Sequence, residues 1–331
     1  MFLKNYYMTF ILSLITGTVM AVSSNSWFTS WVGLEINLMS MIPLMLISLK
    51  KNFTEAAIKY FLAQALGSVF LIFTITVNFF FSELFLLEMT EVFLITSLSL
   101  KAGLAPFHYW FPQVSNLLDW SQCLIIFTWQ KIAPLLLFIS MNLKMIFFIS
   151  MTSAMIGAMG GLNQNFTKLV MAYSSISHAG WLVIGCSLST NTLISYFLIY
   201  SFLSLTIVNF FFNNQIMKIK QIFSCSDSNF NKNILILNFL SLGGIPPLLG
   251  FLAKLTILST AIKFNVLIIF IPLISASLIS LFFYTRLIYS NLLNRSPKNL
   301  NFSLMKKSPK SFLFSTSIFM NTIFPLLILL T

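Results

Sequence analysis

The sequence predicts an all-α, polytopic membrane protein: a bundle of about 11 transmembrane helices with two inverted-topology halves and two broken helices. Three observations lead to this fold class. The chain is 58% hydrophobic and only 8% charged, whereas soluble domains carry roughly 25% charged residues. Apolar runs recur along its whole length. The basic residues gather in the links between these runs, which is typical of membrane topology.

The expected helices follow from the requirement of about 20 apolar residues per span. They cover residues 3–22, 27–48, 55–80, 90–112, 121–140, 145–162, 167–187, 191–212, 233–259, 265–289 and 311–330. These runs leave no room for a separate soluble domain, so we expect residues 1–331 to form a single membrane domain. The first run lacks a small-residue cleavage site and an Arg/Ser-rich transit character, and we interpret it as the first span.

The loop charges test this count, because basic residues favour the cytoplasmic or matrix side of a membrane protein. If alternate loops are given to one side, starting with the N-terminus, that side collects Lys4, Lys50, Lys51, Lys168, Lys218, Lys220, Lys232, Arg295, Lys298, Lys306, Lys307 and Lys310. The other side holds only Lys144 and Lys263, with Glu83, Glu88 and Glu91. The N-terminus is therefore expected on the cytoplasmic or matrix side, and the C-terminus on the opposite side.

Two longer links lie on the basic side. Residues 213–232 place several isoleucines on one helical face, which fits either a short interfacial helix or a solvated loop. Residues 294–307 form a basic linker that could contact lipid headgroups.

Composition also excludes several function classes. The net charge of +12 would suggest nucleic acid in a soluble protein, but here it follows membrane topology, so no nucleic-acid partner is expected. Three scattered cysteines, Cys123, Cys186 and Cys225, form neither a disulfide framework nor a CxxC site. With His108 and His178 as the two histidines, we expect no haem, iron–sulfur or zinc ligand set.

Four charges remain inside the apolar spans: Glu35, Lys101, Lys131 and Lys254. A charge near the bilayer centre costs about 2.5–3.5 kcal/mol on insertion scales, so each is a functional candidate. The alternative is a static ion pair that fixes helix register. One glutamate cannot neutralise three lysines, and an apolar environment disfavours the charged form of a lysine. Some of these lysines are therefore expected to lose and regain a proton.

Two of the predicted spans contain helix breakers. "LSLKAGLAPFHYWFP", residues 98–112, interrupts the fourth span with Gly103 and Pro106, and Lys101 precedes the break. "LGGIPPLLGF", residues 242–251, interrupts the ninth, and Lys254 follows the break. Interrupted segments in corresponding halves indicate an inverted-repeat ion transporter. Two proline kinks that merely shape a bundle are the alternative.

Five stretches together resemble a known family: the antiporter-like membrane subunits of respiratory complex I. They are "WVGLEINLMSMIPLM", "SLSLKAGLAPFHYWFP", "TWQKIAPLL", "LNQNFTKLVMAYSSISHAGW" and "LGGIPPLLGFLAKL", in the family's order and over most of the chain. One departure is that a single span precedes Glu35, where bacterial members have additional spans. This shortening resembles the animal mitochondrial form.

The resemblance implies one proton-translocating, antiporter-like domain with its broken helices at about 90–112 and 233–259. Glu35 would match the family's glutamate that pairs with the lysine of the first broken helix, here Lys101. Lys131 would match the connecting lysine, and Lys254 the lysine of the second broken helix. His178 would lie in the central polar helix as a possible relay, and His108 would support the first break.

The resemblance also implies the setting of the protein. The expected partners are the other membrane-arm subunits of complex I and the lipid bilayer, with cardiolipin a candidate lipid. NADH, flavin, iron–sulfur clusters and ubiquinone would belong to other subunits, leaving no cofactor in this chain. The expected location is the mitochondrial inner membrane, with the N-terminus in the matrix and the C-terminus in the intermembrane space. The alternatives are a cation/proton antiporter outside complex I and a non-transporting scaffold.

Overall fold

The computed structural model describes residues 2–47, 50–80, 84–141, 143–224, 229–263 and 270–293, together with 316, 317, 319 and 321. The described part of the chain is helical apart from one isolated β-bridge between Phe166 and Lys218. The all-α prediction is therefore confirmed. The expected eleventh helix, 311–330, and the basic linker, 294–307, lie almost entirely outside the described residues.

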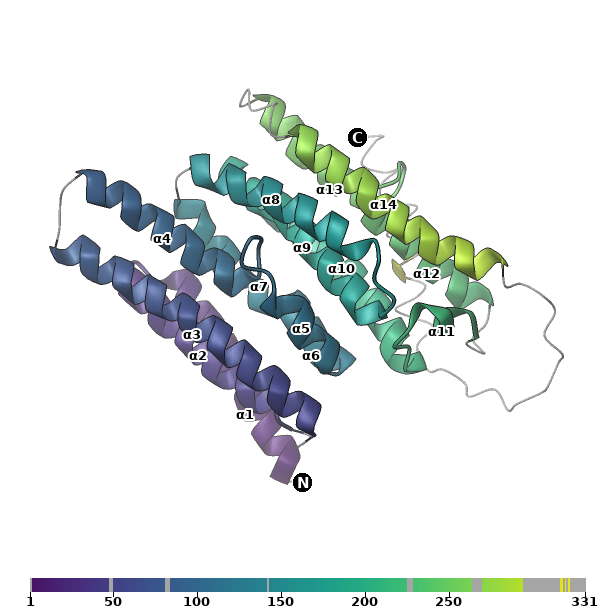
Figure 1. Cartoon of the computed structure of the whole chain (residues 1–331), viewed down its shortest axis with the longest axis horizontal. Coiled ribbons are helices and arrows are strands. Elements are labelled where there is room, and N and C mark those ends of the chain that lie inside the picture. The colour runs from purple at the N-terminus through teal and green to yellow at the C-terminus, as the bar shows by residue number, and fades with distance from the viewer. Residues whose placement is uncertain are drawn as a thin grey trace.

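The helices form two groups along the long axis of the molecule (Figure 1). The first group contains α1 (Phe2–Ser23), α2 (Trp27–Met45), α3 (Lys51–Phe80), α4 (Leu84–Ala102), α5 (Trp110–Leu117), α6 (Trp120–Phe127) and α7 (Trp129–Leu137), which is followed by a short 3₁₀ turn, η1 (Phe138–Ser140). The second contains α8 (Leu143–Gly161), α9 (Thr167–Leu188), α10 (Thr190–Asn214), α11 (Ile219–Ser224), α12 (Asn229–Gly243), α13 (Leu249–Lys263) and α14 (Phe270–Leu293).

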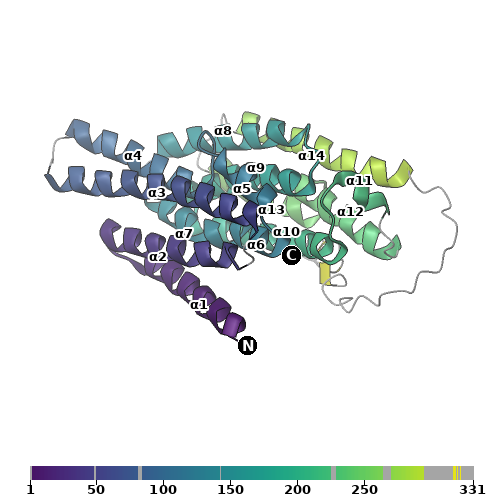
Figure 2. The ribbon, with the colours of Figure 1, turned by 60° about the horizontal axis from the view of Figure 1, so that its bottom comes forward.

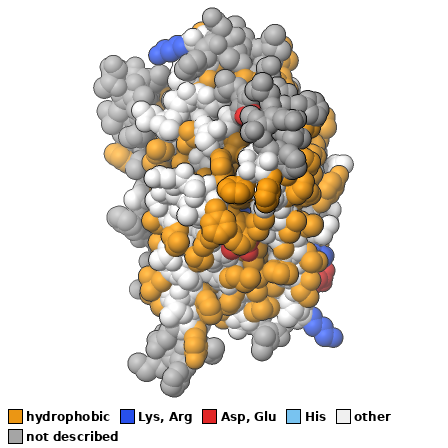
Figure 3. Space-filling view, turned by 90° about the vertical axis from the view of Figure 1, so that its left-hand side faces the viewer, with side chains coloured by type: hydrophobic (Ala, Val, Ile, Leu, Met, Phe, Trp, Pro, Cys, Tyr) orange, Lys and Arg blue, Asp and Glu red, His pale blue; other side chains and the backbone are white. Residues whose placement is uncertain are grey.

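Six stretches of the described residues are long and apolar enough to cross a membrane: Tyr6–Ser23, Lys51–Phe80, Trp120–Ser140, Thr167–Leu188, Thr190–Asn214 and Phe270–Tyr289. The count of 11 is not confirmed by this criterion. The outer helices carry their apolar side chains on the surface, and Figure 3 shows hydrophobic side chains across the middle of one face, with Lys and Arg near its ends. This distribution is that of a multi-pass membrane protein.

The central element is α9, which is surrounded by the rest of the bundle in both views (Figures 1 and 2). In the apolar segment of α9, 89% of the residues are buried inside the protein, whereas 22% are buried in the apolar segment of α1. A polar stretch is tolerated here because it faces neighbouring helices rather than lipid. The serine hydroxyls of Ser174, Ser175 and Ser177 all donate to carbonyls of α9 itself, one turn earlier.

Glycine in the "GAMGG" stretch, residues 157–161, allows α8 to approach α9 closely. A Cβ at Gly157 would lie 2.5 Å from the backbone nitrogen of Ser177 and 2.9 Å from the carbonyl oxygen of Tyr173. Gly161 instead lies against the ring of Phe283 on α14. Small residues of this kind bring helix backbones into van der Waals contact, which is a main source of stability in membrane bundles.

Gly157→Ala is therefore expected to push α8 away from α9. Overpacking of this kind costs roughly 1–3 kcal/mol, and the melting temperature of the purified assembly should fall. Gly185→Ala is the matched control, since its Cβ would meet Leu193 at an ordinary 3.4 Å. Equal melting temperatures for the two variants would contradict the close-packing role of Gly157.

Three sequence expectations need correction. Residues 121–140 were expected as one helix, but α6 ends at Phe127 and α7 begins at Trp129, with Thr128 between them. The Thr128 hydroxyl donates to the Leu124 carbonyl at 2.8 Å, and a side-chain bond of this kind to the preceding turn often bends a helix. Lys168 was assigned to a loop, yet it is buried in α9 and its ammonium donates to the Leu118 carbonyl.

The third correction concerns residues 213–232. They contain the short helix α11, but Ile216 and Ile222 are buried in the hydrophobic core of the protein. A short helix is thus present, and two isoleucines of this segment pack on the bundle, which differs from a fully solvated loop. Cys225 lies outside the described residues. Nearer the surface, Glu55 and Lys59 form an ion pair at 2.7 Å, Asp119 is the N-cap residue of α6, and the exposed Arg286 donates to the Leu162 carbonyl.

Candidate functional site

Both predicted breaks are present, and their backbones are the same. The break between α4 and α5 begins at Gly103 with φ +71°, and the break between α12 and α13 begins at Gly244 with φ +84°. In each case the glycine bonds the carbonyl three residues back, and the next residue bonds the carbonyl five residues back. This is the Schellman motif, which requires a left-handed residue that glycine adopts without strain. Lys101 therefore corresponds to Leu242 in the second break.

The first break presents Lys101 to a carboxylate. Lys101 lies in the last turn of α4, where the negative end of the helix dipole favours a cation. Its side chain is buried, and its Nζ is 3.7 Å from Oε1 of Glu35 on α2. That distance is an ion pair, but it exceeds the about 2.7–2.9 Å of a direct charged hydrogen bond. Gly67 on α3 makes room for the lysine stem, since a Cβ there would lie 3.0 Å from Lys101 Cγ.

Glu35 is the more accessible partner of this pair. Its side chain is 23% exposed, against 2% for Lys101. Among the described residues, Lys101 is the one cation at ion-pair distance from Glu35. The pair is therefore asymmetric: Lys101 is enclosed by the bundle, while Glu35 reaches its surface.

Lys131 occupies the centre of the bundle. It is only 2% exposed, and its Nζ donates to the carbonyl of Ser175 on α9 at 2.7 Å. The ammonium also lies 5.2 Å from the ring centroid of Phe111 and 5.5 Å from that of Tyr200. Cation–π contacts stabilise a desolvated ammonium. Phe111 also packs against Gly103, so one aromatic ring separates the first break from Lys131.

Lys254 belongs to the second break, although it follows the break in sequence. Its Nζ donates to the carbonyl of Gly243, the last residue of α12, at 2.8 Å. The lysine thus turns back to the C-terminus of the preceding half-helix, where the dipole again favours a cation. Lys101 and Lys254 therefore lie at equivalent helix ends, despite their different positions relative to the two breaks.

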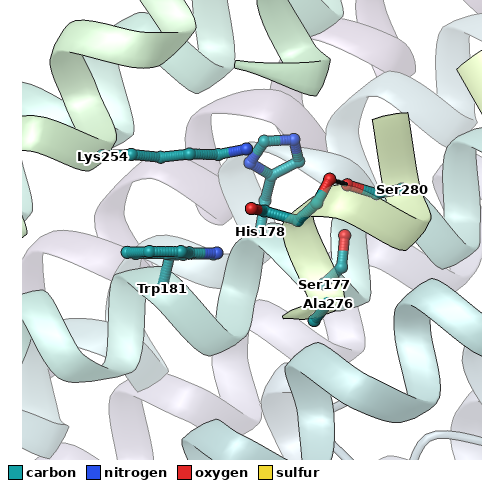
Figure 4. A pocket seen from close by; sticks show the side chains of 7 residues that line it. Ser177, His178, Trp181, Lys254, Ala276 and Ser280 are labelled. Carbon is teal, nitrogen blue, oxygen red and sulfur yellow. Dashed lines mark hydrogen bonds between the residues drawn. The ribbon is translucent and has the colours of Figure 1, made fainter. Parts of the chain in front are cut away.

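His178 on α9 is close enough to both Lys131 and Lys254 to interact electrostatically with them. Its Nδ1 is 2.9 Å from the hydroxyl of Tyr196 on α10. Figure 4 shows the Lys254 side chain extending toward His178 beside Ser177, Trp181 and Ser280. These residues line a cavity of about 10 Å³, which is about the space of one ordered water.

His108 takes a different position from His178. Its Nδ1 lies 3.3 Å from the Pro106 carbonyl, and its ring stacks on Tyr109. These contacts lie within the loop of the first break, and the supporting role of His108 stays a prediction. Of the six predicted site residues, Glu35, Lys101 and His108 thus lie at the first break and Lys254 at the second, while Lys131 lies on α7 and His178 on α9 beside the cavity that Lys254 also lines.

Sequence reasoning missed four residues of this site. Gln64 and Trp110 donate to the carbonyls of Lys101 and Leu100, at 3.2 Å and 3.0 Å. Tyr196 and Tyr200 contact His178 and Lys131. The signal was weak but present: a lone glutamine in "FLAQALGS" and two tyrosines spaced i, i+4 in "YFLIY" are polar groups in otherwise apolar spans.

Two broken helices, buried lysines in excess of carboxylates and a central polar helix define an ion-translocating membrane protein of the antiporter class. A family model described as "NADH:quinone oxidoreductase/Mrp antiporter, TM" matches residues 24–280. A relative named NADH-ubiquinone oxidoreductase chain 2 from Anopheles gambiae is 44% identical over 88% of this chain and 87% of its own. Its counterpart from Aedes aegypti is 40% identical over 85% and 84%. The chain belongs to this NADH-ubiquinone oxidoreductase chain 2 family.

Solved structures agree on the fold. A chain of "Respiratory complex I from Thermus thermophilus with bound Aureothin" has a TM-score of 0.85 at 21% identity, covering 95% of this chain and 77% of that chain. A chain of the Mrp complex from Dietzia sp. has a TM-score of 0.75 at 17% identity, covering 85% and 59%. The antiporter-like fold is therefore shared beyond the range of close sequence similarity.

Proposed function

We propose that this chain is a proton-translocating membrane-arm subunit of respiratory complex I, coupling electron transfer from NADH to ubiquinone in other subunits to proton movement through its buried lysines. The observation that carries the proposal is the burial of Lys101, Lys131 and Lys254 on the broken helices and on α7, with Glu35 at ion-pair distance from Lys101. A protein that needed only stability would place apolar side chains there, because buried charges rarely add net stability.

The proposed path begins at the ion pair. Glu35 stabilises protonated Lys101, and weakening the pair releases a proton toward Lys131. The charge then passes laterally through His178 or ordered water to Lys254. Lys101 and Lys131 are 4% and 2% exposed, so neither faces lipid. His108 acts through the geometry of the first break and takes no proton in this scheme.

The proposal includes the setting of the chain. Residues 1–331 act as one antiporter-like domain with inverted halves, in the mitochondrial inner membrane. The N-terminus lies in the matrix and the C-terminus in the intermembrane space, following the excess of basic loops. Other membrane-arm subunits are its protein partners, and cardiolipin is a lipid partner for the basic linker. The NADH, flavin, iron–sulfur and quinone chemistry occurs in other subunits, so this chain needs no cofactor.

The similarity to the Mrp complex chain favours a second function, a cation/proton antiporter outside complex I. Native gels separate the two. The complex I proposal requires the chain to migrate with NADH dehydrogenase activity. Migration in a smaller complex without that activity would favour the antiporter. A scaffold role predicts instead that the lysines can be neutralised without loss of translocation.

Tyr196→Phe tests the lateral step. The variant keeps the ring but removes the hydroxyl that holds His178 Nδ1. Loss of this buried bond leaves a polar group unsatisfied, at a cost of about 1–3 kcal/mol. We expect slower proton translocation per assembled complex. Tyr289→Phe on the exposed end of α14 is the control, and equal rates in both variants would remove His178 from the path.

A further inference from the structure

The two broken helices end in the same motif but satisfy their last carbonyls differently. At the second break, the carbonyl of Gly243 accepts from the ammonium of Lys254. At the first break, where Ala102 corresponds to Gly243, the carbonyl one residue earlier, that of Lys101, accepts from the side-chain amide of Gln64 on α3 at 3.2 Å. A buried helix end needs such donors, because its terminal carbonyls have no partner within the helix. The first terminus therefore receives a neutral donor where the second receives a charge.

This difference frees the ammonium of Lys101. Because Gln64 occupies the carbonyl, Lys101 has no need to cap its own helix end and can turn to Glu35 at 3.7 Å. Gln64 is itself buried, and Gly67, one turn further on the same face of α3, contacts the Lys101 stem. One face of α3 thus both caps the terminus and gives the lysine its space.

We infer that Gln64 is a positioning residue of the relay: it satisfies the Lys101 carbonyl with a neutral amide and thereby directs the Lys101 ammonium to Glu35. The inference rests on the proposed function of Lys101. Without the amide, the terminus would attract the nearest cation, which is the ammonium of Lys101 itself. The lysine would then adopt the arrangement of Lys254, and the pair with Glu35 would loosen.

Gln64→Met in the assembled complex tests this inference, since methionine keeps the length and loses the donor. We expect a normal amount of complex on native gels and proton translocation slower by about tenfold, equivalent to ~1.4 kcal/mol. The structure of the assembled variant should show a Glu35–Lys101 separation longer than 3.7 Å. Ser68→Ala is the control, because the Ser68 hydroxyl bonds only the Ala65 carbonyl of its own helix.

Each outcome decides the inference. Wild-type translocation by Gln64→Met, or an unchanged separation, overturns it. If Gln64→Met does not assemble, Gln64→Asn is the deciding variant, because asparagine keeps the amide on a side chain one methylene shorter. The inference then requires that Gln64→Asn assembles and translocates protons slowly. Loss of assembly in both variants assigns Gln64 a purely structural role and also overturns the inference. Intact translocation by Lys101→Met would instead refute the proposed function. If Lys101→Met loses translocation but Gln64→Met translocates at the wild-type rate, the inference alone is refuted.

Discussion

Replacing Lys101 with methionine in the fully assembled complex is expected to abolish coupled proton translocation and to slow NADH oxidation with it. Methionine fills the same buried space beside Gly67 but cannot carry the proton. Removal of a proton-transferring group typically costs about 10²- to 10⁴-fold, so the residual rate should be at least about tenfold below wild type. The measurement is protons translocated per NADH oxidised in reconstituted vesicles.

Two variants serve as comparisons for Lys101→Met. Lys59→Met removes a lysine from an exposed i, i+4 pair with Glu55, and pairs of this kind contribute little. It should translocate at the wild-type rate. Glu35→Gln removes the partner charge, and we expect a smaller loss than for Lys101→Met because the lysine remains. Unchanged turnover and translocation in Lys101→Met would establish a structural role for the lysine and favour the scaffold.

Lys254→Met should have an equally large effect through a second cause. The variant removes the proposed terminal proton carrier, and it also leaves the Gly243 carbonyl without its donor. A buried carbonyl that loses its partner costs about 1–3 kcal/mol, so the melting temperature should fall together with translocation. Lys101→Met should leave the melting temperature less affected, because Gln64 caps its helix end.

Lys263→Met is the control for the second broken helix. Lys263 lies at the exposed end of α13, about two and a half turns of helix beyond Lys254. Its loss should change neither the melting temperature nor the translocation rate. If Lys254→Met behaves like Lys263→Met, the proposed lateral path ends at Lys131 or His178, and the second broken helix has no part in proton transfer.

The equivalence of the two breaks supports the proposal that both lysines belong to one mechanism. Each break exposes the C-terminal carbonyls of a half-helix inside the protein, where unsatisfied groups are costly. Each places a lysine near this helix end: Lys101 in the last turn, paired with Glu35, and Lys254 on the helix that follows, bonded to the Gly243 carbonyl. Neither lysine forms a short charged hydrogen bond with a carboxylate. Each can therefore lose its proton more readily than a lysine in a close salt bridge.

Much of this site could be predicted from the sequence, because the relevant residues are exceptions in an apolar chain. Charge inside a span is costly, so Glu35, Lys101, Lys131 and Lys254 could be recognised individually. Gly103 and the Gly243–Gly244 pair mark the breaks, since glycine and proline interrupt helices for local steric reasons. All four charged residues lie on helices of the bundle, and both breaks occur where the sequence placed them.

Other features could not be predicted because they depend on distant neighbours. The burial of Lys168 arises from the approach of α5 and α6, which bring the Leu118 carbonyl and the Trp120 ring to its ammonium. No strong helix breaker in the sequence marks the separation of α6 from α7 at Thr128. Gln64 and Tyr196 acquire their roles only because α3 packs on α4 and α10 packs on α9.

The sequence by itself determined the class of protein, the interrupted helices and the identity of the buried charges, because these depend on composition and local backbone chemistry. The tertiary structure alone decided the partners. Lys254 follows its break in the chain, yet its ammonium reaches back to Gly243, which makes it the counterpart of Lys101. A long lysine side chain bonds whichever acceptor the packed helices bring within reach, and that choice is set by helix packing rather than by position in the chain.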